Sequence, residues 1–221
     1  MTLTVAIDGP AAAGKGTLAR RLAASLGLPY LDTGLLYRAV GRRALDTGAD
    51  PADPAAAEAA ALALHPDDLA RNDLRGPEAD AAASQVAVHP GVRAALVRFQ
   101  RDFAASGAVL DGRDIGTVIL PGATVKLFVT ADQPSRARRR WLELEGRGLH
   151  VPEAQVLAEL QARDAQDASR AAAPLRAAPD ATVLDTTHLD ADATFDRALK
   201  VVRDRQQRFS PAHRSMVDNK P

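Results

Sequence analysis

The chain has 221 residues, which predicts one compact domain with at most a small appended module, and Lys plus Arg equal Asp plus Glu at 28 each. The resulting formal net charge of zero excludes the strong basic excess of a general nucleic-acid or acidic-membrane binder, so we expect neither partner. Cysteine is absent, which rules out disulfides, thiolate metal sites and a cysteine nucleophile, and the five histidines lack the spacing of zinc ligands.

Short apolar, β-rich runs alternate with stretches of helical spacing along the chain. In chain order we expect strand 3–7, helix 15–26, strand 28–31, helix 33–45, helices 54–64, 77–88 and 90–103, strands 108–110 and 125–129, helices 135–145 and 152–173, and strand 182–184. This alternation predicts an α/β fold, a five-stranded parallel sheet with helices on both faces. Ligands of such a sheet bind at the carboxyl ends of its strands.

We expect residues 1–221 to form one domain with two excursions from the sheet. A crossover between parallel strands needs only about a dozen residues, so the helical stretch 35–107 predicts a subdomain at the edge of the sheet. Residues 135–152 hold a second, Arg-rich excursion, and 209–221 resemble a loosely held tail. No apolar run has the length of a membrane span, and Asp8 interrupts the run that a signal peptide would require, so we expect a cytoplasmic protein.

A glycine-rich segment lies between the first predicted strand and the first predicted helix. Gly9 and Gly14 permit backbone conformations closed to other residues, so successive N–H groups can converge on a phosphate at the positive end of the helix. The ammonium of Lys15 would neutralise β- and γ-phosphate oxygens. A Gly-rich turn with an exposed lysine is the alternative, but the flanking strand and helix favour a phosphate loop. The expected ATP-binding residues are Gly9, Pro10, Ala11, Ala12, Ala13, Gly14, Lys15, Gly16 and Thr17.

The loop departs from the general phosphate-loop pattern at one position. Gly16 occupies the place of the usual hydroxyl residue and Thr17 follows it, a form found in nucleoside monophosphate kinases. It is therefore an open question whether a hydroxyl bonds directly to Mg²⁺ here, as it does in the general pattern. We expect the metal site to use water, with Thr17 and with Asp111 at the end of strand 108–110.

Arginines follow two of the predicted strands. Arg38 ends a segment after the second strand, and Arg113 comes just after the third, so both lie along the same rim of the sheet as the phosphate loop. Transfer of a phosphoryl group between two polyanions requires positive charge at this place, and Arg supplies it with bidentate geometry. The pattern therefore predicts a kinase with a second, anionic substrate.

The chain resembles the bacterial cytidylate kinases, which belong to the nucleoside monophosphate kinases, from about residue 3 to 205. Five motifs stand in the family's order: Asp-Gly-Pro-x-x-x-Gly-Lys-Gly-Thr, Leu-Asp-Thr-Gly-x-x-Tyr-Arg, Ser84-Gln85-Val86-Ala87, Asp-Gly-Arg-Asp-Ile-Gly-Thr and Arg163-Asp164-x-x-Asp167-x-x-Arg170-x-x-x-Pro174-Leu175. The resemblance implies a monomeric enzyme that uses ATP and Mg²⁺ to phosphorylate CMP and dCMP by direct in-line transfer. It also implies that 35–107 contains the substrate-binding insertion and that 135–152 is a lid.

The resemblance implies roles for individual residues. The matching family residues place Ser84, Arg93 and Asp114 on cytosine, Arg38, Arg113 and Arg170 on the monophosphate, Arg163 and Asp167 on the sugar, Thr33 on the substrate, and Arg139 and Arg140 of the lid on ATP. Lys15, Arg113, Arg163 and Arg170 would form the catalytic set. A carboxylate at 114 accepts from the exocyclic amine of cytosine, which uracil lacks, so it would discriminate the two bases. Positions 163, 167 and 170 would share one helix face.

Several of these residues have ordinary structural interpretations. Arg163 with Asp167 could be a surface ion pair, Ser84 a helix-surface serine, and Arg113 with Asp114 a pair that fixes a turn. The basic helix 135–145 could be a solvated face or could touch RNA. The functional alternatives are a kinase for another nucleoside monophosphate or small metabolite, and an RNA-associated phosphate-loop ATPase. A regulatory GTPase is disfavoured because its guanine-reading Asn-Lys-x-Asp is absent.

The chain departs from the family at two places. Relatives usually carry strands in the substrate-side insertion, whereas residues 62–76 are too short and polar for much sheet. Gln166 stands where many relatives have an arginine beside Asp167, which removes one positive charge near the donor phosphates.

Overall fold

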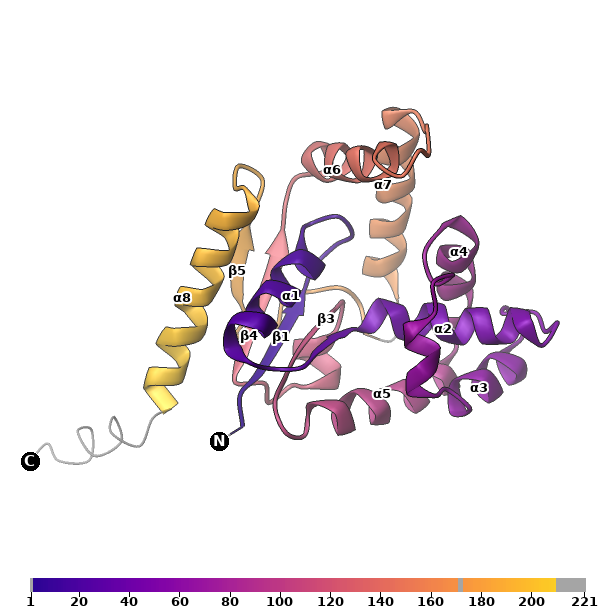
Figure 1. Ribbon diagram of the computed structural model, residues 1–221, viewed down its shortest axis with the longest axis horizontal. Helices are drawn as coiled ribbons and strands as arrows, with labels where there is room; N and C mark the ends of the chain where they lie inside the picture. Colours follow the sequence, from indigo (N-terminus) through magenta and orange to yellow (C-terminus); the bar gives the residue numbers. More distant parts are fainter. Residues whose placement is uncertain (1, 171–172, 210–221) are drawn as a thin grey trace, which may run out of the picture. The chain divides into compact units, whose positions relative to one another are not determined.

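The computed structural model describes residues 2–170 and 173–209 and divides into two compact units (Figure 1). The first unit contains Met1–Leu31 and Ser106–Pro221, and the second contains Asp32–Ala105. The second unit covers most of the stretch for which we expected a subdomain. The expected tail 209–221 begins at the last residue of a helix and otherwise lies outside the described residues.

The first unit is built on a sheet of five strands, the number predicted, in the order β2-β3-β1-β4-β5. Its strands are β1 (Thr4–Asp8), β2 (Tyr30–Asp32), β3 (Ala108–Gly112), β4 (Val125–Thr130) and β5 (Thr182–Asp185). Strand β1 pairs in parallel with β3 on one side and β4 on the other, so that Asp8 lies beside both Gly112 and Phe128. The segment after β1 therefore emerges at the centre of the sheet's carboxyl edge.

Side chains alternate across β1 and divide the first unit's packing into two faces. Val5 and Ile7 are fully buried in a core shared with helices α1 (Lys15–Leu26) and α8 (Ala191–Phe209), which lie side by side in Figure 1. Ala6 and Asp8 point to the opposite face, where Asp8 bonds to the short helix η2 (Ile115–Ile119). Helical segments thus cover both faces, which the predicted fold requires.

In the first unit, the sequence patterns missed two helical segments and extended one helix too far. Helix α8 was not predicted, and η2 is a π-turn in which the carbonyl of Asp114 accepts from the amides of Val118 and Ile119 at 2.8 and 3.2 Å. Helix α7 spans Glu153–Ser169, so the predicted helix 152–173 is too long. It ends because Arg170 takes an extended ψ of 125° and the amide of Leu175 bonds back to the carbonyl of Asp167.

Helices α6 (Gln133–Glu145) and α7 form a hairpin against the loop that follows β1 (Figure 1). Asp132 caps α6 by accepting from the amide of Ser135 at 2.8 Å. Ala137, Val156 and Leu160 form the hairpin's buried cluster, and Ala11 and Ala12 of the glycine-rich loop pack against it. The loop and the hairpin therefore share one apolar contact.

The second unit is helical after β2 ends at Asp32. Its elements are α2 (Thr33–Asp46), α3 (Pro54–Leu62), the 3₁₀ turn η1 (Pro66–Ala70), α4 (Pro77–Val86) and α5 (Pro90–Ala104). Each of α3, α4 and α5 begins at a proline, whose fixed φ and missing N–H suit the first helical turn. The described residues 62–76 contain η1 and no strand, which confirms the predicted departure from sheet.

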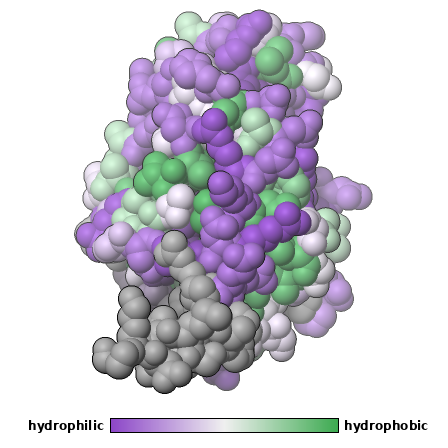
Figure 2. All heavy atoms as spheres, turned by 90° about the vertical axis from the view of Figure 1, so that its left-hand side faces the viewer, coloured by the Kyte–Doolittle hydropathy of each residue, from purple (hydrophilic) through white to green (hydrophobic). Residues whose placement is uncertain are grey.

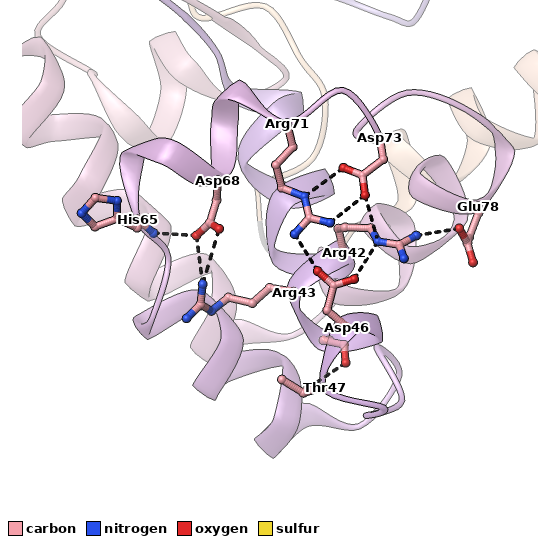
Figure 3. Close-up of polar contacts among 10 residues, drawn as sticks. Arg42, Arg43, Asp46, Thr47, His65, Asp68, Arg71, Asp73 and Glu78 are labelled. Carbon is pink, nitrogen blue, oxygen red and sulfur yellow. Dashed lines mark hydrogen bonds and ion pairs between the residues drawn. The ribbon is translucent and has the colours of Figure 1, made fainter.

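Ion pairs connect the elements of the second unit along its surface (Figure 3). Arg42 contacts Asp46 at 2.9 Å and Glu78 at 2.8 Å. Arg71 contacts Asp46 and Asp73, both at 2.6 Å, and Arg43 contacts Asp68 at 3.1 Å. Such exposed pairs contribute roughly 0–1 kcal/mol each, so they direct the packing of the loop 66–76 more than they stabilise it.

The face that carries α8 is mainly hydrophilic, with smaller apolar patches between the polar groups (Figure 2). This agrees with the amphipathic spacing of α8, whose buried Ala198 and Val202 face the core while Arg203 and Asp204 are exposed. Among the helices of the described residues, none combines the length and the apolar character that a membrane crossing needs.

Candidate active site

The glycine-rich loop takes backbone conformations that only a few residue types tolerate. Gly14 has φ 89° immediately before α1, and Ala12 has φ 58°. Gly9 has φ 149°, and a Cβ at this position would overlap the carbonyl oxygen of Val129 on β4. Alternation of left- and right-handed backbone turns successive amides toward one point, in front of the helix's positive end. The geometry suits a phosphate.

Lys15 is buried at the start of α1. Its ammonium donates to the carbonyl of Pro10 at 2.8 Å across the loop, and the residue is 6% exposed. Burial, and then the charges of Arg113 and Arg163, lower the pKa of Lys15 to about 7, while the carboxylates of Asp111 and Asp8 oppose the shift. An anion placed there would offset the effect of burial and stabilise the ammonium form of Lys15.

Asp8 closes the central strand and was not among the predicted site residues. Its two carboxylate oxygens accept from the amides of Ile115 and Gly116, each at 2.8 Å, which ties β1 to η2. Burial raises the pKa of Asp8 to about 6, although these two hydrogen bonds and the charge of Lys15 lower it, and the charge of Asp114 raises it further. A carboxylate at the end of an otherwise apolar strand was the available signal.

Asp111 and Thr17 provide oxygen atoms beside the first turn of α1. Tyr30 donates its hydroxyl to Asp111 at 2.9 Å, and a Cβ at Gly16 would lie 3.7 Å from the other carboxylate oxygen. Thr17 is exposed in the same turn. Carboxylate and hydroxyl oxygens suit Mg²⁺, which prefers oxygen ligands and retains several of its own waters. The residues present thus fit the expected metal.

Two of the predicted substrate residues of the first unit, Arg113 and Arg170, meet at Asp167. This carboxylate contacts Arg113 Nε at 2.8 Å and Arg170 at 2.6 Å, and its side chain is 2% exposed. An exposed surface pair is therefore the wrong interpretation of Asp167. Positions 163 and 167 both lie within α7, and Arg170, the residue that caps the helix, contacts Asp167 three positions earlier.

Asp114 follows Arg113 directly along the chain, and Arg163 lies on α7, the helix that also carries Asp167. Asp114 is 8% exposed at the start of η2, one residue after Arg113. Arg163 lies on α7 close enough to Lys15 for its charge to lower the lysine's pKa. The assignment of Asp114 to cytosine and of Arg163 to the sugar stays a prediction.

The arginines of α6 divide between two tasks. Arg136, 3% exposed, donates to the loop carbonyl of Ala11 at 3.2 Å and to both oxygens of Asp164 at 3.1 and 2.6 Å. Arg139 instead donates to the hydroxyl of Thr186 at 3.0 Å, and Arg140 pairs with Glu143 at 2.9 Å. Of the Arg-rich run, it is Arg136 that bonds to the loop, although only Arg139 and Arg140 were predicted to bind ATP.

The second unit carries the other predicted substrate residues. Thr33 is the buried first residue of α2, Arg38 lies one turn further along it, and Arg93 lies in the first turn of α5. Arg38 Nε contacts Asp80 at 2.8 Å, and the hydroxyl of Ser84 donates to the carbonyl of the same residue at 3.0 Å. Arg38 and Ser84 therefore share Asp80 as a partner.

Known proteins resemble this chain over nearly its whole length. A family model described as cytidylate kinase matches residues 5–204. A protein named cytidylate kinase from Granulibacter bethesdensis is 65% identical over 204 residues, which cover 92% of this chain and 98% of that protein. Another of that name from Paramagnetospirillum magneticum is 61% identical over 207 residues, covering 91% and 98%.

Solved structures with lower identity share the fold alone. An uncharacterized protein from Eubacterium ventriosum aligns with a TM-score of 0.56 and 15% identity, covering 91% of this chain and 99% of that one. A gluconokinase from Sinorhizobium meliloti aligns with a TM-score of 0.50 and 13% identity, covering 91% and 92%. The parallel α/β architecture is therefore found in other proteins, one of them a kinase.

Proposed function

Because this chain belongs to the cytidylate kinase family, we propose that it transfers the γ-phosphoryl group of ATP to CMP and dCMP, forming ADP and CDP or dCDP. The observation that carries the proposal is the buried Lys15, which bonds across a phosphate-loop backbone at the start of α1 and feels the charges of Arg113 and Arg163. Phosphates that enter such a site stabilise the ammonium form that burial disfavours.

The transfer needs no side-chain nucleophile. An oxygen of the acceptor monophosphate is already anionic and attacks the γ-phosphorus in line, so the bond to the β–γ bridging oxygen breaks and ADP leaves. Catalysis then depends on positioning and charge stabilisation. The loop amides and Lys15 hold the donor phosphates, and Arg113, Arg163 and Arg170 stabilise the charge of the transferred group.

Asp111 and Thr17 would hold Mg²⁺ through water, and the ion would neutralise charge on the β- and γ-phosphates. The contact of Asp111 with Tyr30 supports this role because it fixes the carboxylate beside α1. Residues 135–152 act as the lid that excludes water, and Arg139 and Arg140 leave Thr186 and Glu143 to contact ATP when it binds.

Different residues recognise the different parts of the acceptor nucleotide. Ser84, Arg93 and Asp114 read cytosine, Arg38, Arg113 and Arg170 hold the monophosphate, Arg163 and Asp167 hold the sugar, and Thr33 contacts the substrate. The burial of Asp167 between Arg113 and Arg170 supports a common substrate for these three residues, since the cluster holds two cations on one carboxylate. An entering phosphate would share the two guanidiniums with that carboxylate.

The test is a panel of acceptors. ADP formation from ATP is measured side by side with CMP, dCMP, UMP, AMP and no acceptor, each with and without Mg²⁺. We expect CMP and dCMP to be the best acceptors, with little turnover when no acceptor is present. Faster turnover with another acceptor would replace the proposed substrate. Hydrolysis without an acceptor that RNA stimulates would favour an RNA-dependent ATPase.

A further inference from the structure

Helices α2 and α4 pack against each other at unusually close range. A Cβ added to Gly41 on α2 would lie 2.8 Å from the Cβ of Ala82 on α4 and 2.9 Å from that residue's carbonyl carbon. Real side chains do not approach so closely, so a glycine at 41 is what permits this spacing. The close approach brings Arg38, one turn before Gly41, opposite Asp80 of α4.

The contact between Arg38 and Asp80 is a partly shielded ion pair. Arg38 Nε lies 2.8 Å from a carboxylate oxygen of Asp80, and the two side chains are 20% and 25% exposed. A guanidinium carries five N–H donors, and this contact uses the one on Nε. The terminal amino groups form the fork that matches phosphate oxygens, and an anchor at Nε fixes the plane in which the fork lies.

Asp80 also holds a second residue through a different atom. Its backbone carbonyl accepts from the hydroxyl of Ser84 at 3.0 Å, one helical turn further along α4. Its carboxylate therefore acts on the residue assigned to the monophosphate, while its main chain acts on a residue assigned to the base. Replacing the carboxylate alone separates the two effects, because the backbone carbonyl stays.

We propose that Asp80 is a positioning residue for the acceptor monophosphate, which fixes the guanidinium of Arg38 before the nucleotide arrives. The inference rests on the proposed function, since it takes the phosphate of CMP as the ligand of Arg38. A fixed guanidinium loses less rotational freedom on binding, so the anchor lowers the KM for CMP. If the negative carboxylate of Asp80 mainly repelled the entering phosphate, it would instead raise the KM for CMP.

Glu78 and Arg42 offer a matched control across the same two helices. Their contact is also 2.8 Å long and joins α4 to α2, but the Glu78 side chain is 73% exposed and neither residue is assigned to the substrate (Figure 3). Glu78→Gln removes the same charge from the same helix. Any general effect of α4 charge on the fold or on the surrounding potential appears in this variant as well.

The experiment compares Asp80→Asn, Glu78→Gln, Arg38→Lys and the double variant Arg38→Lys with Asp80→Asn. We expect Asp80→Asn to raise the KM for CMP about tenfold, because it exchanges a charge-assisted hydrogen bond for a neutral one. The KM for ATP and the ratio of kcat/KM for CMP over UMP should stay at wild-type values. Glu78→Gln should behave as the wild type. In the Arg38→Lys background, Asp80→Asn should change the KM for CMP little further, because lysine has no planar guanidinium for Asp80 to orient.

Three results overturn the inference. These are a CMP KM that is unchanged or lower in Asp80→Asn, an equal rise in Glu78→Gln, and an undiminished effect in the Arg38→Lys background. Melting temperatures are measured for every variant, and Asp80→Ser is the second charge-removing variant if Asp80→Asn does not fold. Failure of the proposed function has a different signature, because wild-type protein then fails to phosphorylate CMP at all.

Discussion

At the residue scale, two buried charges beside the phosphate loop have pKa values displaced toward neutrality from opposite sides. Burial lowers the pKa of Lys15 to about 7 and raises the pKa of Asp8 to about 6. The ionised form of each group is therefore unfavourable in the folded protein, and its pKa responds to any charge that binds or titrates nearby. This makes both residues sensitive reporters of the site.

ATP binding should take up protons through Lys15. Above pH 7 the free protein carries Lys15 largely neutral, and the negative phosphates restore its ammonium form, so binding at pH 8 should consume up to one proton and ATP affinity should fall as pH rises from 7 to 9. Calorimetry in two buffers of different ionisation enthalpy measures the uptake.

The Lys15→Ala variant should show no proton uptake, and its kcat should fall at least a hundredfold, at about 1.4 kcal/mol for each factor of ten. Near-normal turnover by that variant would contradict the assigned role.

Asp8→Asn should change how stability depends on pH. The pKa of Asp8 is about 6 in the folded state and 3.8 in the unfolded chain. The contribution of Asp8 to the free energy of unfolding is therefore fully present below pH 3.8 and is lost as the pH rises through 6. The wild type should therefore lose up to about 3 kcal/mol relative to Asp8→Asn between pH 4 and pH 7. Urea unfolding of both proteins at several pH values measures the difference. A difference that is constant with pH would show that Asp8 does not titrate in this way.

Asp114→Asn should reduce the preference for CMP over UMP. A carboxylate accepts from the exocyclic amine of cytosine, whereas an amide can also donate to the uracil carbonyl, so the ratio of kcat/KM values should fall roughly ten- to a hundredfold. Asp132→Asn is the matched control, since Asp132 caps α6 through Ser135 and asparagine caps nearly as well. An unchanged ratio in Asp114→Asn would remove this residue from base recognition.

At the element scale, small residues and buried pairs set how helices meet. Gly41 permits the close approach of α2 and α4. In the first unit, Arg136 joins the α6–α7 hairpin to the loop through Asp164 and the carbonyl of Ala11. Both contacts connect helices to residues assigned to a substrate, so a change in helix packing should alter substrate binding.

Gly41→Ala should separate α2 from α4 and weaken CMP binding. The added Cβ meets Ala82 at 2.8 Å, and overpacking of this kind typically lowers the free energy of unfolding by about 1–3 kcal/mol. The KM for CMP should rise with little change in the KM for ATP. Gly122→Ala is the control, because a Cβ there has no atom within 4 Å. Equal behaviour of the two variants in unfolding and in KM would refute the packing argument.

At the scale of the whole molecule, the two units differ in what stabilises them. The first has central strands whose Val5, Ile7 and Val109 are fully buried in the core that the sheet shares with α1 and α8. The second consists of helices, among them α3 with its run of alanines, and carries exposed ion pairs (Figure 3). Less apolar area is buried per residue by alanine than by larger side chains, and exposed pairs add little.

Hydrogen exchange should therefore be faster in the second unit. We expect the amides of α3 and α4 to open by local fluctuations at a lower free energy than those of β1 and β3, which should approach global unfolding. CMP should slow exchange in α4 because binding adds stability to the folded form. The measurement is mass-spectrometric exchange with and without CMP. Equal protection of the two units in the unbound protein would contradict this difference.

The sequence by itself determined the strands, most of the helices and the phosphate loop. Their signals are local, since side-chain periodicity reports which face is buried and a glycine-rich segment between strand and helix needs only neighbouring residues. Lys15 could be singled out on this basis. The roles of Arg38, Ser84 and Arg170 came from the resemblance of short motifs to a known family and remain to be tested.

Only the tertiary structure decided which groups meet and in what surroundings. Strand order, the contact of Arg113 with Asp167 across 54 positions, the contact of Arg38 with Asp80 and the burial of Asp8 all join residues that are distant along the chain or depend on packing around them. No periodic pattern encodes such partners, because a local sequence fixes the direction of a side chain but not what folds against it. The end of α7 at Ser169 follows the same rule, since the bond from Leu175 depends on the path of the chain beyond the helix.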